Sequence, residues 1–62
     1  MNAPVWPVVI EARGPDVVGV DHGSGFVVVI ITSMRGCESA CLTPAQSATL
    51  RAALEAAEQE MS

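Results

Sequence analysis

Phe26-Val27-Val28-Val29-Ile30-Ile31 is an uninterrupted apolar run in the middle of a chain of 62 residues. Because side chains alternate between the two faces of a β-strand, this run predicts a strand over residues 26–33 that is apolar on both faces. Such a strand needs cover on both sides, and a chain of this length has little material to supply it. The pattern therefore predicts self-association, most simply as a homodimer.

Two further strand patterns precede this run. Residues 5–12 predict a first strand at a sheet edge, because Pro4 and Pro7 lack the N–H that an inner strand requires. Residues 17–21 predict a short second strand. The turn signals between the three strands are Arg13-Gly14-Pro15-Asp16 and His22-Gly23-Ser24-Gly25. The sequence thus predicts a three-stranded antiparallel sheet.

In a plain three-stranded meander the third strand lies at an open edge, where a long hydrophobic strand tends to pair with another chain. Pairing with its own copy across a two-fold axis gives a continuous sheet, and packing two sheets face to face hides the same surface. Both arrangements remain open at this point. The predicted interface residues are Val27, Val29 and Ile31. Trp6 is either a core residue under the helix or an exposed interface residue.

A C-terminal helix is predicted over about residues 44–60, after a loop at residues 34–42. Thr43 is a good N-cap, Pro44 suits the first helical position, and Gln46 completes a capping box. One helical stripe is expected to face the sheet: Leu50, Leu54, Ala57 and Met61, with Ala53 beside them. The predicted fold is therefore a single small α+β domain over residues 1–62, of ββ(β)α type, with the helix on one face of the sheet.

The charge balance narrows the choice of partners. The formal net charge is -4, with no lysine and only Arg13, Arg35 and Arg51 as cations, so nucleic acid is not an expected partner. No apolar run reaches the ~20 residues of a membrane span, and the N-terminus lacks the pattern of a signal peptide. We expect a cytoplasmic protein without a membrane partner.

Acidic residues crowd the end of the predicted helix, where the helix dipole favours cations. These residues are Glu55, Glu58 and Glu60. They form either a solvated tail or an acidic patch for a basic partner.

Cys37 and Cys41 are the only cysteines. Spaced by four, they could meet on a helical turn, bind a metal with His22 or a carboxylate, form a disulfide, or remain reduced thiols. A structural zinc site usually needs two close pairs of ligands, and the second pair is missing unless a dimer supplies it. We expect reduced thiols in an intracellular chain, and no metal or other cofactor.

Asp21-His22-Gly23-Ser24 places an acid, an imidazole and a hydroxyl close together in the sequence. Neighbours along a strand point to opposite faces, and a catalytic triad is assembled from positions separated in sequence. The serine also lacks the residue spacing of a nucleophile elbow. We interpret the segment as a turn, and we expect no catalytic residues.

At Leu42-Thr43-Pro44 and along Leu50-Arg51-Ala52-Ala53-Leu54-Glu55-Ala56-Ala57, the chain resembles short uncharacterised proteins of actinobacteria and their phages. Those proteins combine two or three strands with a terminal helix. The resemblance implies a small strand-plus-helix fold and an accessory role, and it assigns no site residue.

The expected function is that of a non-enzymatic, self-associating protein-interaction or regulatory module, for example a phage-type accessory protein that binds a host or viral protein. Two alternatives belong to other classes. One is an acidic inhibitor that mimics nucleic acid, and the other is a metal or redox protein that uses the two cysteines.

Overall fold

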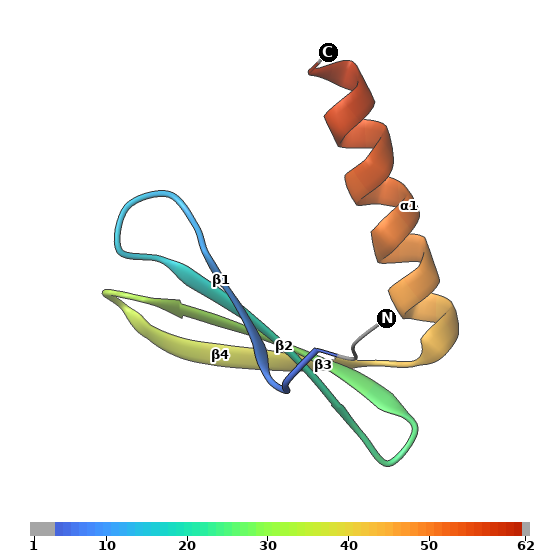
Figure 1. Cartoon of the computed structure of the whole chain (residues 1–62), viewed down its shortest axis with the longest axis horizontal. Helices are drawn as coiled ribbons and strands as arrows, with labels where there is room; N and C mark the ends of the chain where they lie inside the picture. Colours follow the sequence, from blue (N-terminus) through green and yellow to red (C-terminus); the bar gives the residue numbers. More distant parts are fainter. Residues whose placement is uncertain (1–3, 62) are drawn as a thin grey trace.

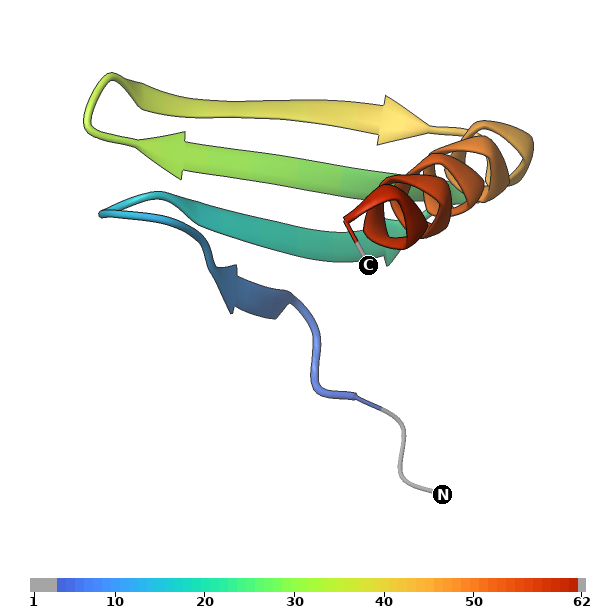
Figure 2. The same ribbon diagram turned by 90° about the horizontal axis from the view of Figure 1, so that it is seen from above.

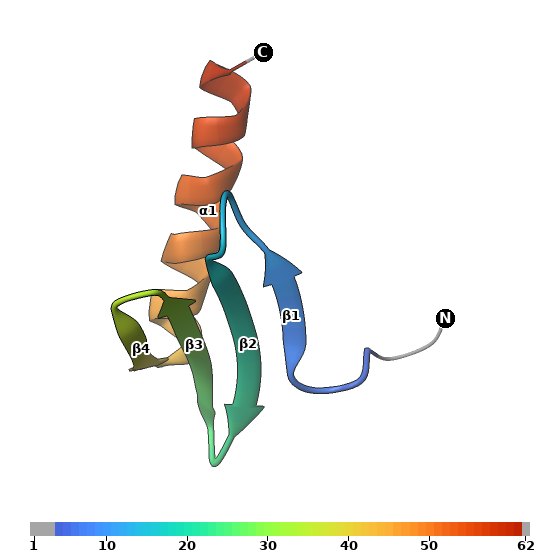
Figure 3. The same cartoon turned by 90° about the vertical axis from the view of Figure 1, so that its left-hand side faces the viewer.

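The computed structural model describes residues 4–61. Its elements are β1 (Val8–Glu11), β2 (Val17–Gly23), β3 (Phe26–Ser33), β4 (Gly36–Leu42) and α1 (Pro44–Glu60). The strands form one antiparallel sheet in the order β1-β2-β3-β4 (Figures 1 and 3). The protein is therefore an α+β protein with a C-terminal helix, and the sheet has one strand more than the sequence predicts.

The first three strands lie close to the positions that the hydrophobic pattern predicts, although β2 continues two residues beyond the predicted 17–21, to Gly23, and leaves only Ser24 and Gly25 in the turn. β1 pairs only with β2, so its predicted position at the edge of the sheet is confirmed. It starts at Val8 and not at residue 5, because Pro7 has no N–H to donate to the ladder. The turn after β1 is closed by the Ala12 N–H, which donates to the Asp16 carbonyl at 3.0 Å.

The loop predicted at residues 34–42 is wrong, because Gly36–Leu42 forms β4. Met34 and Arg35 make a tight turn, and β4 then pairs with β3 from Ser33 back to Val27. The apolar character of β3 drives this pairing, although β4 itself, Gly-Cys-Glu-Ser-Ala-Cys-Leu, has no strong strand pattern of its own.

The fourth strand changes which edges are free. β3 lies between β2 and β4, so the expected open edge at the third strand is wrong, and pairing of two copies through that strand is ruled out by this fold. Among residues 4–61, the free edges of the sheet belong to β1 and β4.

The predicted start of the helix is confirmed in atomic detail. The Gln46 N–H donates to Thr43 Oγ1 at 3.2 Å, and the Thr43 N–H donates to Gln46 Oε1 at 3.0 Å. These two bonds are a complete capping box, with Pro44 at the first helical position.

The helix does not lie on a face of the sheet, so this prediction is wrong. α1 rises steeply from the end of β4 and contacts only β3 and β4 (Figures 1 and 2). No helical residue is buried, and Leu50 and Leu54 of the predicted sheet-facing stripe are 40% and 55% exposed. The connection explains this difference: because β4 takes up the predicted loop, only Thr43 joins strand to helix, and so short a connection does not let α1 fold back onto the sheet.

The described residues contain no buried hydrophobic side chain. Gly19, in the middle of β2, is the one residue between 4 and 61 that is buried. The apolar side chains of the sheet are at best half-buried, so the described chain has no closed core.

Candidate interaction surface

The strand register sorts the side chains of the sheet onto two faces. Val29 of β3 lies opposite Val20 of β2 and Ala40 of β4, and Val20 lies opposite Val8 of β1. Residues directly opposite one another in antiparallel strands share a face. We call this side the apolar face, and its apolar members are Val8, Ile10, Val18, Val20, Val27, Val29, Ile31, Ala40 and Leu42.

Three of the predicted interface residues lie together on this surface. Val27, Val29 and Ile31 follow one another along β3, with β2 on one side and β4 on the other. Val27 and Val29 are half-buried by these neighbours, whereas Ile31 is 54% exposed. They form the middle row of the apolar face.

Trp6, the fourth predicted interface residue, borders the same face. Its ring meets the His22 ring edge-on, with ring centroids 4.8 Å apart. His22 lies opposite Val27, which places this pair at the Val27 end of the apolar face. Trp6 remains 43% exposed, so it is a rim residue and not a buried core residue.

The helix begins beside that end of the sheet. Pro44, His22 and Val27 line one shallow depression of about 260 Å³. From there α1 rises away from the sheet (Figure 1). Because the helix and the sheet diverge, the apolar stripe of α1 (Leu50, Leu54, Ala57 and Met61) and the apolar face do not cover each other within one chain.

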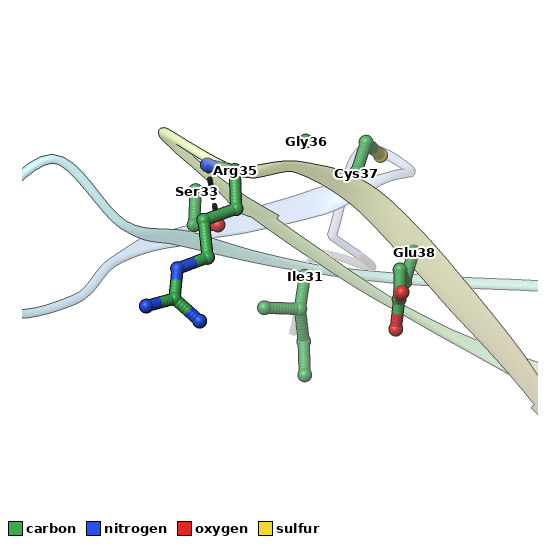
Figure 4. A pocket seen from close by; sticks show the side chains of 6 residues that line it. All are labelled: Ile31, Ser33, Arg35, Gly36, Cys37 and Glu38. Atoms are coloured by element: carbon green, nitrogen blue, oxygen red, sulfur yellow. Dashed lines mark hydrogen bonds between the residues drawn. The ribbon is translucent and has the colours of Figure 1, made fainter.

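A second depression, of about 370 Å³, lies at the β3–β4 turn; its lining residues are Ile31, Ser33, Arg35, Gly36, Cys37 and Glu38. In Figure 4 the side chains of Ile31, Arg35 and Glu38 point to one side of this hairpin, and Cys37 points to the other. The Arg35 N–H donates to Ser33 Oγ at 3.2 Å and fixes the turn.

The apolar face therefore ends in a polar rim that carries one cation, Arg35, and one anion, Glu38. An apolar centre within a polar rim is the usual anatomy of a protein interface. The sequence did not predict this part of the surface, because the pattern placed Arg35 and Glu38 in a loop. The only available signal for the β3–β4 hairpin was a tight turn directly after Ser33.

The opposite side of the sheet is of mixed character, and we call it the mixed face. Its apolar members are Val9, Val17, Phe26, Val28 and Ile30, and its polar and thiol members are Glu11, Asp21, Thr32, Cys37, Ser39 and Cys41. Polar groups are thus spread over this side, which makes it less suited to complete burial than the apolar face.

The two cysteines and His22 do not meet within the chain. Cys37 and Cys41 lie opposite Thr32 and Val28 on the mixed face, about 13 Å apart along the strand. They are exposed free thiols on a strand and not neighbours on a helical turn. His22 lies on the other face, and residues 4–61 contain no cluster of three or more potential metal ligands.

The Asp21-His22-Gly23-Ser24 segment lies at the end of β2 and in the turn that follows. The His22 backbone N–H donates to Asp21 Oδ1 at 2.8 Å, while the two side chains belong to opposite faces. Ser24 sits in the turn with a φ of 50°. The acid, the imidazole and the hydroxyl are therefore not arranged as a triad.

The acidic side chains are not gathered on one surface. Glu11 and Asp21 lie on the mixed face, Glu38 lies at the rim of the apolar face, and Asp16 follows the first turn. The remaining three are on α1. This distribution gives the nucleic-acid-mimic alternative no supporting surface.

Comparison of the chain with protein-family models, with curated proteins and with solved structures gave no match in any of the three. The resemblance to actinobacterial and phage proteins stays a prediction. Among the residues described, no helix is long and apolar enough to cross a membrane.

Proposed function

We propose that this chain is a non-enzymatic protein-interaction module that works as a homo-oligomer, in which a second copy covers the apolar face. One observation carries the proposal: the folded chain has an accessible surface of 5308 Å². A compact monomer of 6.4 kDa is expected to expose about 3,800 Å².

The difference between these two surface areas is large enough to accommodate an interface with another protein. An excess of about 1,500 Å² per chain is larger than the roughly 800 Å² that each partner buries in a standard protein interface. The chain also buries only about 43% of its unfolded surface, compared with about 60% for a typical domain of this length. Association with a protein surface of ordinary interface size supplies the missing burial.

The chemistry of the apolar face favours a second copy as the occupant. The middle row Val27, Val29 and Ile31 carries no charge, so two such faces can be desolvated against each other without stranding an ion. The exposed apolar stripe of α1 offers further apolar surface from each copy. A two-fold arrangement needs only this one self-complementary surface, and such dimers are the commonest soluble oligomers.

Self-association leaves other surfaces free for a different protein. The outer side of α1 and the mixed face carry most of the charged groups, and they are the surfaces with which the assembly would bind a host or viral partner in an accessory or regulatory role. The acidic end of α1 favours a basic partner at that point.

The test is the mass of the assembly in solution for Val29→Glu, measured by sedimentation in the presence of a thiol reductant over a range of concentrations. We expect wild type to sediment as a dimer or larger species. Val29→Glu should weaken association by roughly 30-fold or more, because an unpaired charge buried in an interface costs about 2 kcal/mol or more.

Thr32→Glu is the matched control, because Thr32 is an exposed residue of the same strand on the mixed face. It should associate as wild type does. A wild-type chain that remains a stable single subunit at high concentration, or a Val29→Glu variant that associates as tightly as Thr32→Glu, would contradict the proposal.

A further inference from the structure

The free edge of β4 differs from the other edge of the sheet. β1 is short, follows Pro7 and carries Glu11, features that protect an edge from pairing with another chain. β4 is a strand of 7 residues without proline or lysine, and Glu38 is its only charged residue. Its outer edge therefore has few of the usual protections.

The register shows which backbone groups this edge presents. Ser33 and Gly36 flank the two-residue turn, so they exchange both hydrogen bonds of the ladder, and bonded and non-bonded pairs alternate from there. Glu38 and Ala40 are consequently bonded to β3. The backbone N–H and C=O groups of Cys37, Ser39 and Cys41 therefore point away from β3, in the plane of the sheet, toward its free edge.

These outward residues are symmetric about Ser39, with a cysteine two positions to each side. If two β4 edges pair antiparallel about a two-fold axis at Ser39, Cys37 of each copy lies directly opposite Cys41 of the partner subunit. Both cysteines are on the mixed face, so the opposing side chains point the same way. The Cα atoms of such a hydrogen-bonded pair are about 5.5 Å apart, within the range of about 4.4–6.8 Å that a disulfide spans. The Cβ atoms of opposite cross-strand residues are about 4.5–5.5 Å apart, so they must move closer, to about 3.5–4.5 Å, as the bond closes.

We propose that two copies of the chain join edge to edge through β4 about Ser39, and that Cys37 of each then forms a disulfide with Cys41 of the partner subunit. The site is incomplete in one chain, because its two thiols are about 13 Å apart along the strand. The second copy supplies the missing thiol at each end of the paired segment, so that two disulfides can form.

The link forms by thiol–disulfide exchange with a small-molecule disulfide such as oxidised glutathione. One thiolate attacks the small disulfide and displaces a thiol, and the opposing thiolate then displaces the second thiol. Each protein disulfide gains its S–S bond by losing two protons and two electrons, which reduce one small disulfide to two thiols. In the reduced chain Thr32 Oγ1 donates to Cys37 Sγ at 3.5 Å, so the Cys37 side chain must turn from β3 toward the free edge as the link forms.

The edge contact is separate from the one that covers the apolar face. A two-fold axis perpendicular to the sheet leaves both apolar faces on the same side and unoccupied. The protein can therefore use the two contacts together, with the edge contact locked or released by the redox state of its surroundings.

The experiment incubates the folded chain with oxidised glutathione and determines the products by mass spectrometry without reductant. Wild type should give a covalent dimer with two disulfides. Cys37→Ser and Cys41→Ser should each lose the covalent dimer, and an equimolar mixture of the two variants should regain it with a single disulfide.

That mixture distinguishes the proposed register from the alternatives. If either variant alone forms the covalent dimer as readily as wild type, like cysteines pair and the register is overturned. If wild type gives only an intramolecular disulfide or only glutathione adducts, the edge contact itself is overturned.

A second pair of variants tests the strand pairing apart from the thiols. Ser39→Pro removes an outward N–H without removing a bond to β3, so the sheet should keep its circular dichroism spectrum while the covalent dimer is lost. Ser39→Ala should cross-link as wild type does. Equal cross-linking of these two variants would overturn the proposal.

Discussion

Trp6 lies edge-on against His22, with 4.8 Å between ring centroids and 81° between ring planes. This contact ties the segment before β1 to the end of β2, at the rim of the apolar face. Trp6 is the only tryptophan, so it reports on this rim alone.

Trp6 fluorescence should therefore change with self-association. Because the indole is 43% exposed in one chain, covering the apolar face should move its emission to shorter wavelength as the protein concentration rises. Val29→Glu should keep the longer wavelength at every concentration. An emission maximum that is independent of concentration in wild type, across the range where sedimentation shows association, would place the contact elsewhere.

The capping box at Thr43 should be important for stability, because only this residue joins the sheet to the helix. Thr43→Ala removes the acceptor of the Gln46 N–H and should lower the free energy of unfolding by about 1 kcal/mol. Urea unfolding followed by circular dichroism measures the loss.

Thr49→Ala is the matched control for that change. Thr49 Oγ1 donates to the Ala45 carbonyl inside the helix. Loss of this hydroxyl leaves no backbone group of the helix without a partner, unlike loss of the cap. Alanine is also the better helix former. The control should be neutral or slightly stabilising. A loss as large as that of Thr43→Ala would mean that the cap has no special role.

The helix and the apolar strands could be predicted from the sequence because their signals are local. Thr43, Pro44 and Gln46 specify the helix start through capping alone, and the run from Phe26 to Ile31 specifies β3 through its composition. Both sets of signals act within a few residues of the backbone they order.

β4 could not be predicted in the same way. Its residues Cys37, Ser39 and Ala40 carry little strand preference, and the strand forms because β3 offers a row of backbone partners. The wrongly predicted loop also led to the wrong position for the helix, because a loop at residues 34–42 would have let α1 fold back onto the sheet. The rim at Arg35 and Glu38 was missed for the same reason.

Gly19 offers a stabilising substitution. A Cβ atom at Gly19 would lie 3.6 Å from the Ile30 Cβ, an ordinary contact distance. Gly19→Ala should raise the free energy of unfolding by about 0.5–1 kcal/mol, because alanine loses less backbone freedom on folding. Thermal or urea unfolding measures the gain.

Gly14→Ala should have the opposite effect and serves as the comparison. Gly14 has open space around it but a φ of 68°, which costs an L-residue roughly 1–2 kcal/mol. Destabilisation by both variants would show that the middle of β2 is packed more tightly than these distances indicate.

The apolar stripe of α1 is the last surface whose role can be measured. Leu54 is 55% exposed on a helix that has no buried residue, so it contributes little to the stability of one chain. If the stripe takes part in self-association, Leu54→Glu should weaken the assembly by roughly 30-fold or more, because its charge would be buried there. Ala52→Glu, on the opposite side of the helix, should leave the assembly intact. Equal sedimentation of the two variants would restrict the contact to the sheet, and it would leave the helix free for a different protein.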